Sequence, residues 1–216
     1  EPPRVVAEVK FRSPSAGEIR RWAAGEGRRV ARAYERAGAS AISVLCDRAG
    51  FGGSPLELRR VAGAVSVPLL FKEFVLDPIQ VELARRVGAS MVLLLVRAMG
   101  DEALRAMVAA CRAAGLAPVV EAADEAEMER ALATGARIVG INARDLSTFR
   151  VDPARAARAV RNVPESRVAV YMSGVSSPDE LARVAATRAD AVLVGSGLMR
   201  APDPGRRLAE LLEAHA

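Results

Sequence analysis

Short apolar runs alternate along the chain with longer amphipathic segments rich in Ala, Arg and Glu. The runs are rich in Val, Leu and Ile, and their hydrophobicity is continuous rather than alternating. This pattern is typical of strands buried on both faces of a parallel sheet. We therefore predict eight buried strands, at residues 5–10, 41–46, 68–74, 91–97, 117–121, 138–142, 167–172 and 191–195.

The segments between the runs have the length of helices and carry helix-start signals. Most of them place a Ser or Asp side chain directly before Pro or before an acidic first turn, where it can cap the helix. The predicted starts are Ser54-Pro55, Asp77-Pro78, Asp101, Asp124, Asp152-Pro153, Ser177-Pro178 and Asp203-Pro204.

An internal repeat supports the same alternation. Gly38-Ala39-Ser40, Gly88-Ala89-Ser90 and Gly135-Ala136-Arg137 recur about fifty residues apart, each at a helix end where glycine is favoured. Fifty residues is two strand–helix units, and 216 residues over eight units gives 27 per unit. This predicts one α/β domain over residues 1–216, a (β/α)8 TIM barrel with eight parallel strands. A doubly wound open sheet is the alternative, but no G-x-G-x-x-G follows the first strand.

Composition excludes several classes of protein. The chain is 51% hydrophobic, too apolar for disorder. Residues 91–96 form an apolar run of six, against about 20 for a membrane span. We expect no signal peptide, because only a short apolar run follows Glu1-Pro2-Pro3-Arg4. The two cysteines, Cys46 and Cys111, match neither a disulfide framework nor a metal site, so we expect a cytoplasmic protein.

The net charge of +5 indicates an anionic small-molecule substrate rather than nucleic acid, because the arginines are scattered and aromatic residues make up only 4%. Of 31 basic residues, only Lys10 and Lys72 are lysines. Each of the two lysines lies at the end of an apolar, strand-like run. Because the chain otherwise uses arginine, we infer that arginine cannot replace lysine at these two positions.

Polar groups interrupt the apolar strands at their carboxyl ends, where the active site of such a barrel lies. The residues concerned are Glu8, Lys10, Lys72, Glu121 and Asn142. A lysine there can act as a general acid, a Schiff-base nucleophile or a clamp on an anion. A glutamate can exchange protons, and an asparagine can hold a hydroxyl or an oxyanion. The residue types leave these roles open.

Glycine-rich turns follow the last two predicted strands. They are Ser173-Gly174-Val175 and Gly195-Ser196-Gly197. Small residues let backbone N–H groups face an anion, and the loops after strands seven and eight are the usual phosphate site of this fold. We therefore predict a phosphorylated substrate.

These residues together resemble the indole-3-glycerol phosphate synthase family, in order from about residue 4 to 212. The most specific motifs are Ala7-Glu8-Val9-Lys10 followed by Ser13-Pro14-Ser15, and the segment Gly140-Ile141-Asn142-Ala143-Arg144-Asp145-Leu146. Phe51-Gly52-Gly53-Ser54, Phe71-Lys72-Glu73-Phe74, Val120-Glu121 and Val194-Gly195-Ser196-Gly197-Leu198-Met199 also match.

The resemblance implies a decarboxylating, dehydrating ring closure in tryptophan biosynthesis, without cofactor or metal. The substrate would be 1-(2-carboxyphenylamino)-1-deoxyribulose 5-phosphate. Lys72 would be the general acid, Lys10 would bind the carboxylate, and Glu121 would be the acid and base of dehydration. Glu8 and Asn142 would orient the reacting centre. Arg144 would support the site, Phe51 would pack near the aromatic ring, and the phosphate would be held by Ser13, Gly174, Gly195 and Ser196. Met172 and Ser173 would also line the substrate site.

Two departures from the family pattern stand out. Met172 takes the place of a glutamate that usually lines the site after strand seven, so a carboxylate is replaced by an apolar side chain of similar length. The helical extension that usually precedes the first strand is absent from this sequence. The resemblance further implies a monomer or weak oligomer that does not bind nucleic acid or membranes, and that works beside neighbouring enzymes of the tryptophan pathway.

Three alternatives stay open at this point. Phosphoribosylanthranilate isomerase resembles the barrel and its phosphate loops, but it requires a cysteine in place of Lys10. A Schiff-base aldolase accounts for Lys72 but leaves Lys10, Glu121 and Asn142 without a specific role. A repurposed, engineered or inactive barrel that binds a related sugar phosphate is supported by Met172 alone.

Overall fold

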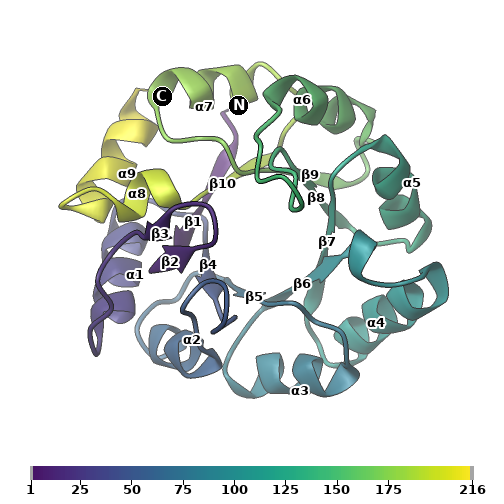
Figure 1. Cartoon of the computed structure of the whole chain (residues 1–216), viewed down its shortest axis with the longest axis horizontal. Coiled ribbons are helices and arrows are strands. Elements are labelled where there is room, and N and C mark those ends of the chain that lie inside the picture. Colours follow the sequence, from purple (N-terminus) through teal and green to yellow (C-terminus); the bar gives the residue numbers. More distant parts are fainter. Residues whose placement is uncertain (1, 215–216) are drawn as a thin grey trace.

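The computed structural model describes residues 2–214 and contains a closed barrel of eight parallel strands. Around the barrel, each strand is hydrogen-bonded to two neighbours in the order β1-β10-β9-β8-β7-β6-β5-β4, and Figure 1 looks down its axis. The strands are β1 Arg4–Val9, β4 Ala41–Leu45, β5 Leu69–Lys72, β6 Met91–Leu95, β7 Ala117–Ala122, β8 Ile138–Asn142, β9 Val168–Met172 and β10 Ala191–Val194. The predicted (β/α)8 barrel is confirmed.

Helices follow the strands and form the outer ring. They are α1 Glu26–Arg36, α2 Pro55–Ala62, α3 Pro78–Arg86, α4 Asp101–Ala113, α5 Glu125–Ala133, α6 Pro153–Asn162, α7 Pro178–Ala185, α8 Ser196–Met199 and α9 Pro204–Glu213, with a short 3₁₀ turn at Val96–Ala98. Six of the seven predicted capping side chains accept a backbone N–H at the helix start. The seventh, Asp101, is instead the first helical residue, behind Gly100.

The repeated glycines end alternate helices as predicted. Gly38, Gly88 and Gly135 have φ values of 97°, 92° and 73°, in the left-handed region that a side chain disfavours. The next strand begins three residues after each of these glycines, because the helix ends there and the chain reverses its direction.

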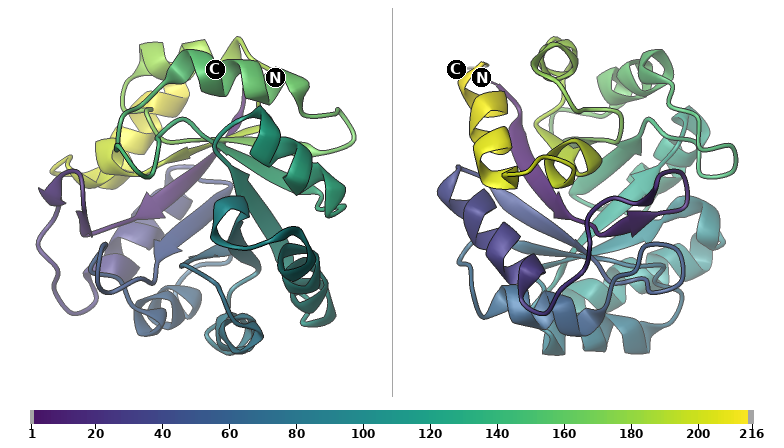
Figure 2. Two further views of the ribbon diagram at one scale, coloured as in Figure 1. Left: turned by 45° about the vertical axis from the view of Figure 1, so that its right-hand side comes forward. Right: turned by 60° about the vertical axis from the view of Figure 1, so that its left-hand side comes forward.

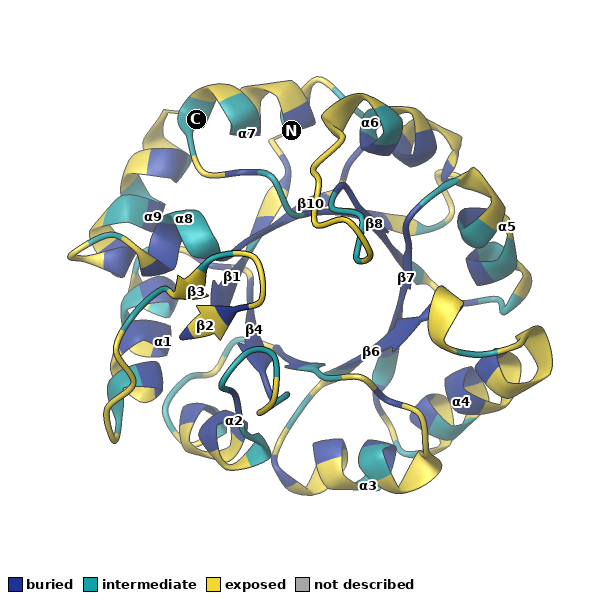
Figure 3. Ribbon diagram, viewed as in Figure 1, coloured by how far each residue is buried: buried dark blue, intermediate teal, exposed yellow. Residues whose placement is uncertain are grey.

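Two cores hold the barrel together. The larger lies between strands and helices, and the smaller fills the barrel interior, so that buried residues line both faces of the strands (Figure 3). The interior core consists of Leu70, Leu93, Leu95, Val119, Val170, Met172, Ala191 and Leu193. It closes the lower part of the barrel and leaves the carboxyl end of the strands for polar groups.

One element at the carboxyl end was not predicted. Between β1 and α1 the chain forms a small hairpin of β2 Arg12–Ser13 and β3 Gly17–Glu18, which lies over the barrel rim (Figure 2). Across residues 2–214, no helix combines the length and apolar character that crossing a membrane requires.

Candidate active site

A pocket of about 490 Å³ opens at the carboxyl ends of the strands. Twelve of the thirteen predicted site residues line it. They are Glu8, Lys10, Ser13, Phe51, Lys72, Glu121, Asn142, Arg144, Ser173, Gly174, Gly195 and Ser196. The exception is Met172, which is buried below the pocket in the interior core.

Glu8 and the two lysines form one ion cluster on the β1 and β5 side of the pocket. Lys10 Nζ lies 2.9 Å from Glu8 Oε1, and Lys72 Nζ lies 3.4 Å from Glu8 Oε2. Ser43 Oγ donates to Glu8 Oε2 at 3.2 Å. Val9, between Glu8 and Lys10, packs into the outer core. Side chains alternate between the two faces of a strand, so the charged side chains on either side of Val9 both point inward.

The cluster fixes the charge of its members. Burial acts to raise the pKa of Glu8, but the charges and hydrogen bonds of Lys10 and Lys72 outweigh it and hold that pKa at about 2. For Lys72, burial opposes the charged form, while Glu8 and then Glu121 favour it, and the pKa ends above its ordinary value. At neutral pH Lys72 is therefore a protonated ammonium with hydrogen atoms to donate.

Glu121 and Asn142 form a second polar group, on adjacent strands β7 and β8. Asn142 Nδ2 donates to Glu121 Oε1 at 2.8 Å. The backbone N–H of Arg144 donates to Asn142 Oδ1 at 2.9 Å, which fixes the orientation of the amide. The other oxygen, Glu121 Oε2, is buried and has no partner among residues 2–214. Such an oxygen can accept or deliver a proton to a molecule in the pocket.

Met172 occupies space that Gly140 leaves free. A β-carbon on Gly140 would lie 2.5 Å from Met172 Cε and 3.7 Å from Glu121 Cα. Met172 and Glu121 thus flank the same glycine on either side. The thioether fills the barrel beneath the Glu121–Asn142 pair and is only 1% exposed.

The turns after β9 and β10 form a third wall. Ser173 and Gly174 have φ values of 70° and 77°; such strain at a non-glycine residue is typical of functional sites. Gly195 approaches the ion cluster so closely that a β-carbon there would lie 2.6 Å from Glu8 Oε1 and 3.2 Å from Lys10 Nζ. Only glycine allows this backbone to come beside the lysine.

An aromatic wall lies opposite these turns. The ring centroids of Phe51 and Phe74 are 6.5 Å apart. Asp47 Oδ2 accepts the backbone N–H groups of Gly50 and Phe51 at 2.6 and 3.0 Å, which shapes the loop that carries Phe51. Phe74 was missed as a lining residue, although its place two residues after Lys72 on the same strand end was a usable signal.

Residues from the loop after β8 also reach the pocket and were not predicted. Leu146 and Phe149 line it, and Phe149 accepts a hydrogen bond from Arg144 Nη1 through its carbonyl at 2.7 Å. Arg200, directly after α8, lines the pocket as well. Such loop residues follow no hydrophobic period, so the sequence alone offers little signal for them.

A (β/α)8 barrel that surrounds two lysines, two buried carboxylates and an aromatic wall defines an enzyme that performs acid–base chemistry on a small anionic molecule. The sequence profile of indole-3-glycerol phosphate synthase matches residues 1–211. The chain belongs to the indole-3-glycerol phosphate synthase family, lyases of tryptophan biosynthesis, as its motifs predicted.

Individual relatives agree with the profile. The indole-3-glycerol phosphate synthase of Opitutus terrae is 43% identical over 211 residues, which cover 95% of this chain and 79% of the relative. That of a Nocardioides species is 44% identical over 200 residues, covering 93% and 76%. Among solved structures, thiamine phosphate pyrophosphorylase from Pyrococcus furiosus superposes with a TM-score of 0.69 at 20% identity, over 98% of this chain and 94% of that one. This last likeness concerns the fold alone.

Proposed function

We propose that the pocket converts 1-(2-carboxyphenylamino)-1-deoxyribulose 5-phosphate into indole-3-glycerol phosphate, with release of carbon dioxide and water. The observation that carries the proposal is the placement of Lys72, held protonated by Glu8, in one pocket with the unpartnered oxygen of Glu121. The first can deliver a proton and the second can exchange one, as ring closure followed by dehydration requires.

Binding uses the three walls of the pocket. Lys10 attracts the substrate carboxylate. The phosphate contacts the backbone N–H groups of Gly174 and Gly195 and the hydroxyls of Ser13, Ser173 and Ser196, with Arg144 adding positive charge. The aromatic ring packs beside Phe51. This arrangement holds the ring carbon that bears the carboxylate next to the ketone carbon.

Ring closure then depends on Lys72. The ring carbon attacks the ketone carbon, and Lys72 Nζ donates a proton to the ketone oxygen, which becomes a hydroxyl. Loss of carbon dioxide from the same ring carbon restores aromaticity. Glu8 keeps Lys72 charged and in place, because its carboxylate pairs with both lysines.

Dehydration depends on Glu121. Its carboxylate removes a proton from the methylene carbon beside the nitrogen and delivers that proton to the hydroxyl, which leaves as water, and the new carbon–carbon double bond completes the indole. Lys72 then regains a proton from solvent. Asn142 holds Glu121 through Oε1 and leaves Oε2 without a hydrogen-bond partner among residues 2–214. Met172 supplies no charge to this step.

The direct test is turnover of this substrate by the purified chain, followed by indole fluorescence, beside Lys72→Ala. We expect activity in the wild type and a loss of about 10⁴-fold in kcat in the variant, with the fold retained by circular dichroism. Borohydride treatment in the presence of substrate should trap no covalent adduct. A trapped adduct at Lys72 would instead support the aldolase alternative, and an inactive wild type that binds the substrate would support the non-catalytic barrel.

We further propose that the enzyme acts in the cytoplasm, as a monomer or weak oligomer beside other enzymes of its pathway. Its two cysteines are buried and unpaired, which fits a reducing compartment.

A further inference from the structure

The segment between β1 and α1 crosses the barrel rim (Figure 2). Side chains of the segment anchor it on two sides. On one side, Arg12 donates to the carbonyl of Ala49 in the loop after β4. On the other side, Arg20 reaches the chain that follows α8. Within the segment, the backbone N–H groups of Ile19 and Arg20 both donate to the carbonyl of Phe11. The hairpin that carries Ser13 is therefore a closed loop with two anchors.

Arg20 is the more elaborate anchor. Its Nη1 donates to the carbonyls of Ala201 at 2.9 Å and Met199 at 3.3 Å, and its Nη2 donates to that of Pro202 at 3.5 Å. Its Nε lies 2.6 Å from Glu26 Oε1. These partners are 179 to 182 residues away in sequence, apart from Glu26. The planar fork of arginine suits such a set, whereas a lysine ammonium cannot reach all four partners.

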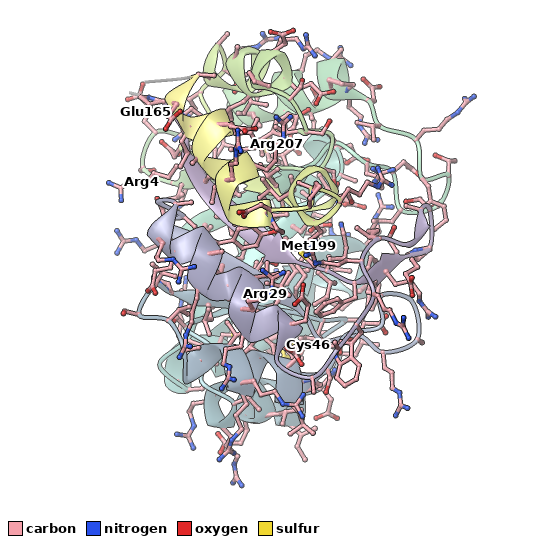
Figure 4. All side chains as sticks on the ribbon, turned by 90° about the vertical axis from the view of Figure 1, so that its left-hand side faces the viewer. Arg4, Arg29, Cys46, Glu165, Met199 and Arg207 are labelled. Atoms are coloured by element: carbon pink, nitrogen blue, oxygen red, sulfur yellow. The ribbon has the colours of Figure 1, made fainter. Side chains whose placement is uncertain are left out.

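Glu26 holds the guanidinium in position. It begins α1 and also pairs with Arg29, at 2.7 Å between Oε1 and Nη2. Hydrogen bonds from Arg29 act against partial burial, and together with those from Arg20 they lower the pKa of Glu26 to about 2. Figure 4 looks onto this side of the molecule, with Arg29 labelled on α1 and Met199 at the end of α8. Glu26 is thus an anion that both arginines share, and it fixes the Arg20 guanidinium at the start of α1.

The two pieces of chain that Arg20 joins both contribute to the pocket. Ser13 lies on the segment before Arg20, and Gly195 and Ser196 lie a few residues before the carbonyls that Arg20 binds. Arg20 itself does not line the pocket. It joins the two pieces of chain from outside the pocket.

We propose that Arg20 is a positioning residue for the substrate phosphate. It holds the β1–α1 segment against residues 199–202, so that Ser13 and the turn at Gly195 and Ser196 are ready on both sides of one phosphate. Without this clamp the segment must be ordered at each binding event, which weakens binding without altering the reacting groups. The inference rests on the proposed function, in which these residues bind phosphate.

The test compares Arg20→Ala and Arg20→Lys with the matched control Arg21→Ala, whose side chain is exposed on the same segment. The readouts are KM and kcat for the substrate, and calorimetric Kd for two probes, inorganic phosphate and 2-aminobenzoate. In Arg20→Ala we expect about a tenfold rise in KM and in the phosphate Kd, because charge-assisted hydrogen bonds that order the segment are lost. The kcat and the 2-aminobenzoate Kd should stay at their wild-type values, Arg20→Lys should be intermediate, and Arg21→Ala should match the wild type.

A merely structural role gives a different result. If Arg20→Ala weakens both probes equally, or lowers kcat at constant KM, the positioning role is overturned. Unchanged phosphate binding in a folded Arg20→Ala overturns it as well, while leaving the proposed function intact. If the wild type itself does not bind inorganic phosphate in competition with substrate, the phosphate assignment of the proposed function fails first. Should Arg20→Ala not fold, the same comparison is made with Arg20→Lys, for which a wild-type phosphate Kd counts against the proposal.

Discussion

Glu8 and Glu121 are both buried in the barrel mouth, at 2% and 5% exposure, but their surroundings differ completely. They lie on β1 and β7, which are four strands apart in either direction around the barrel. Glu8 is bound through both oxygens, by Lys10, Lys72 and Ser43. Glu121 is bound through Oε1 alone, by the neutral amide of Asn142, and its Oε2 has no partner within residues 2–214.

This difference separates two tasks that one residue type can perform. Glu8 is a permanent anion, because two ammonium groups hold its pKa at about 2, far from neutral pH. It cannot exchange protons during turnover, but it keeps two lysines charged and in place. Glu121 faces no lysine at hydrogen-bonding distance and has a free oxygen, which suits proton exchange. Charge placement and proton transfer are thus assigned to opposite sides of the pocket.

We expect the largest effect from a substitution of Glu121, on the side of the pocket that exchanges protons. Glu121→Gln retains an oxygen that can accept from Asn142 but removes the carboxylate. We expect kcat to fall by about 10³-fold, with little change in KM, because dehydration loses its acid and base. Stopped-flow indole fluorescence gives both constants. The control is Glu125→Gln on the exposed surface of α5, which should be fully active. Near-normal turnover by Glu121→Gln would remove this residue from the chemistry.

A carboxylate introduced below Glu121 tests whether the pocket extends down to position 172. Met172→Glu places a second acid below Glu121, in an interior core that offers only apolar contacts. We expect a loss of about 3 kcal/mol in the free energy of unfolding at neutral pH, because a buried carboxylate without a cation is costly. Met172→Leu conserves volume and should lose less than about 1.5 kcal/mol.

Urea unfolding of the two Met172 variants provides the comparison. A Met172→Glu protein as stable as the wild type would contradict the expectation. It would show that the new carboxylate reaches a lysine of the ion cluster, so that position 172 belongs to the pocket after all.

The fold was predictable because its determinants are local. Continuous apolar runs and capping residues mark each strand and most helix starts, so strand positions agree to within about two residues. The predicted strands extend too far where the chain leaves the sheet. Lys10 and Phe74 lie beyond the strand ends and face the pocket, and Val96 begins a 3₁₀ turn. Apolar residues continue beyond the last hydrogen bond between neighbouring strands, so the hydrophobic pattern alone does not show where a strand ends.

The site was predictable where charge stands out against an apolar background, as at Glu8, Lys72 and Glu121. It was not predictable where contacts join distant segments. Phe149 reaches the pocket through an irregular loop, and Arg20 is positioned by carbonyls near the opposite end of the chain. Met172 was expected to line the pocket, but the absence of a side chain at Gly140 lets it fold down into the core.

We expect the smallest effect from the acid titration of Glu8, in the ion cluster. Folding lowers the pKa of Glu8 from an ordinary 4.5 to about 2, so its ionised form stabilises the native state above pH 4.5. This contribution is lost as pH falls from 4.5 toward 2. By pH 3.5 the loss is on the order of 1 kcal/mol, measured as the shrinking difference in unfolding free energy between the wild type and Glu8→Gln.

A surface carboxylate provides the contrast. Hydrogen bonds from Arg85 and Arg86 also lower the pKa of Glu82 on α3 to about 2, but this side chain is 39% exposed at the surface of the helix. Salt screens exposed charges and affects buried ones far less. At 0.5 M salt, the pH dependence attributable to Glu82, measured with Glu82→Gln, should therefore disappear, while that of Glu8 should persist. If salt abolishes the pH dependence of both residues, solvent reaches the Glu8 cluster freely, and burial does not protect its ion pairs from screening.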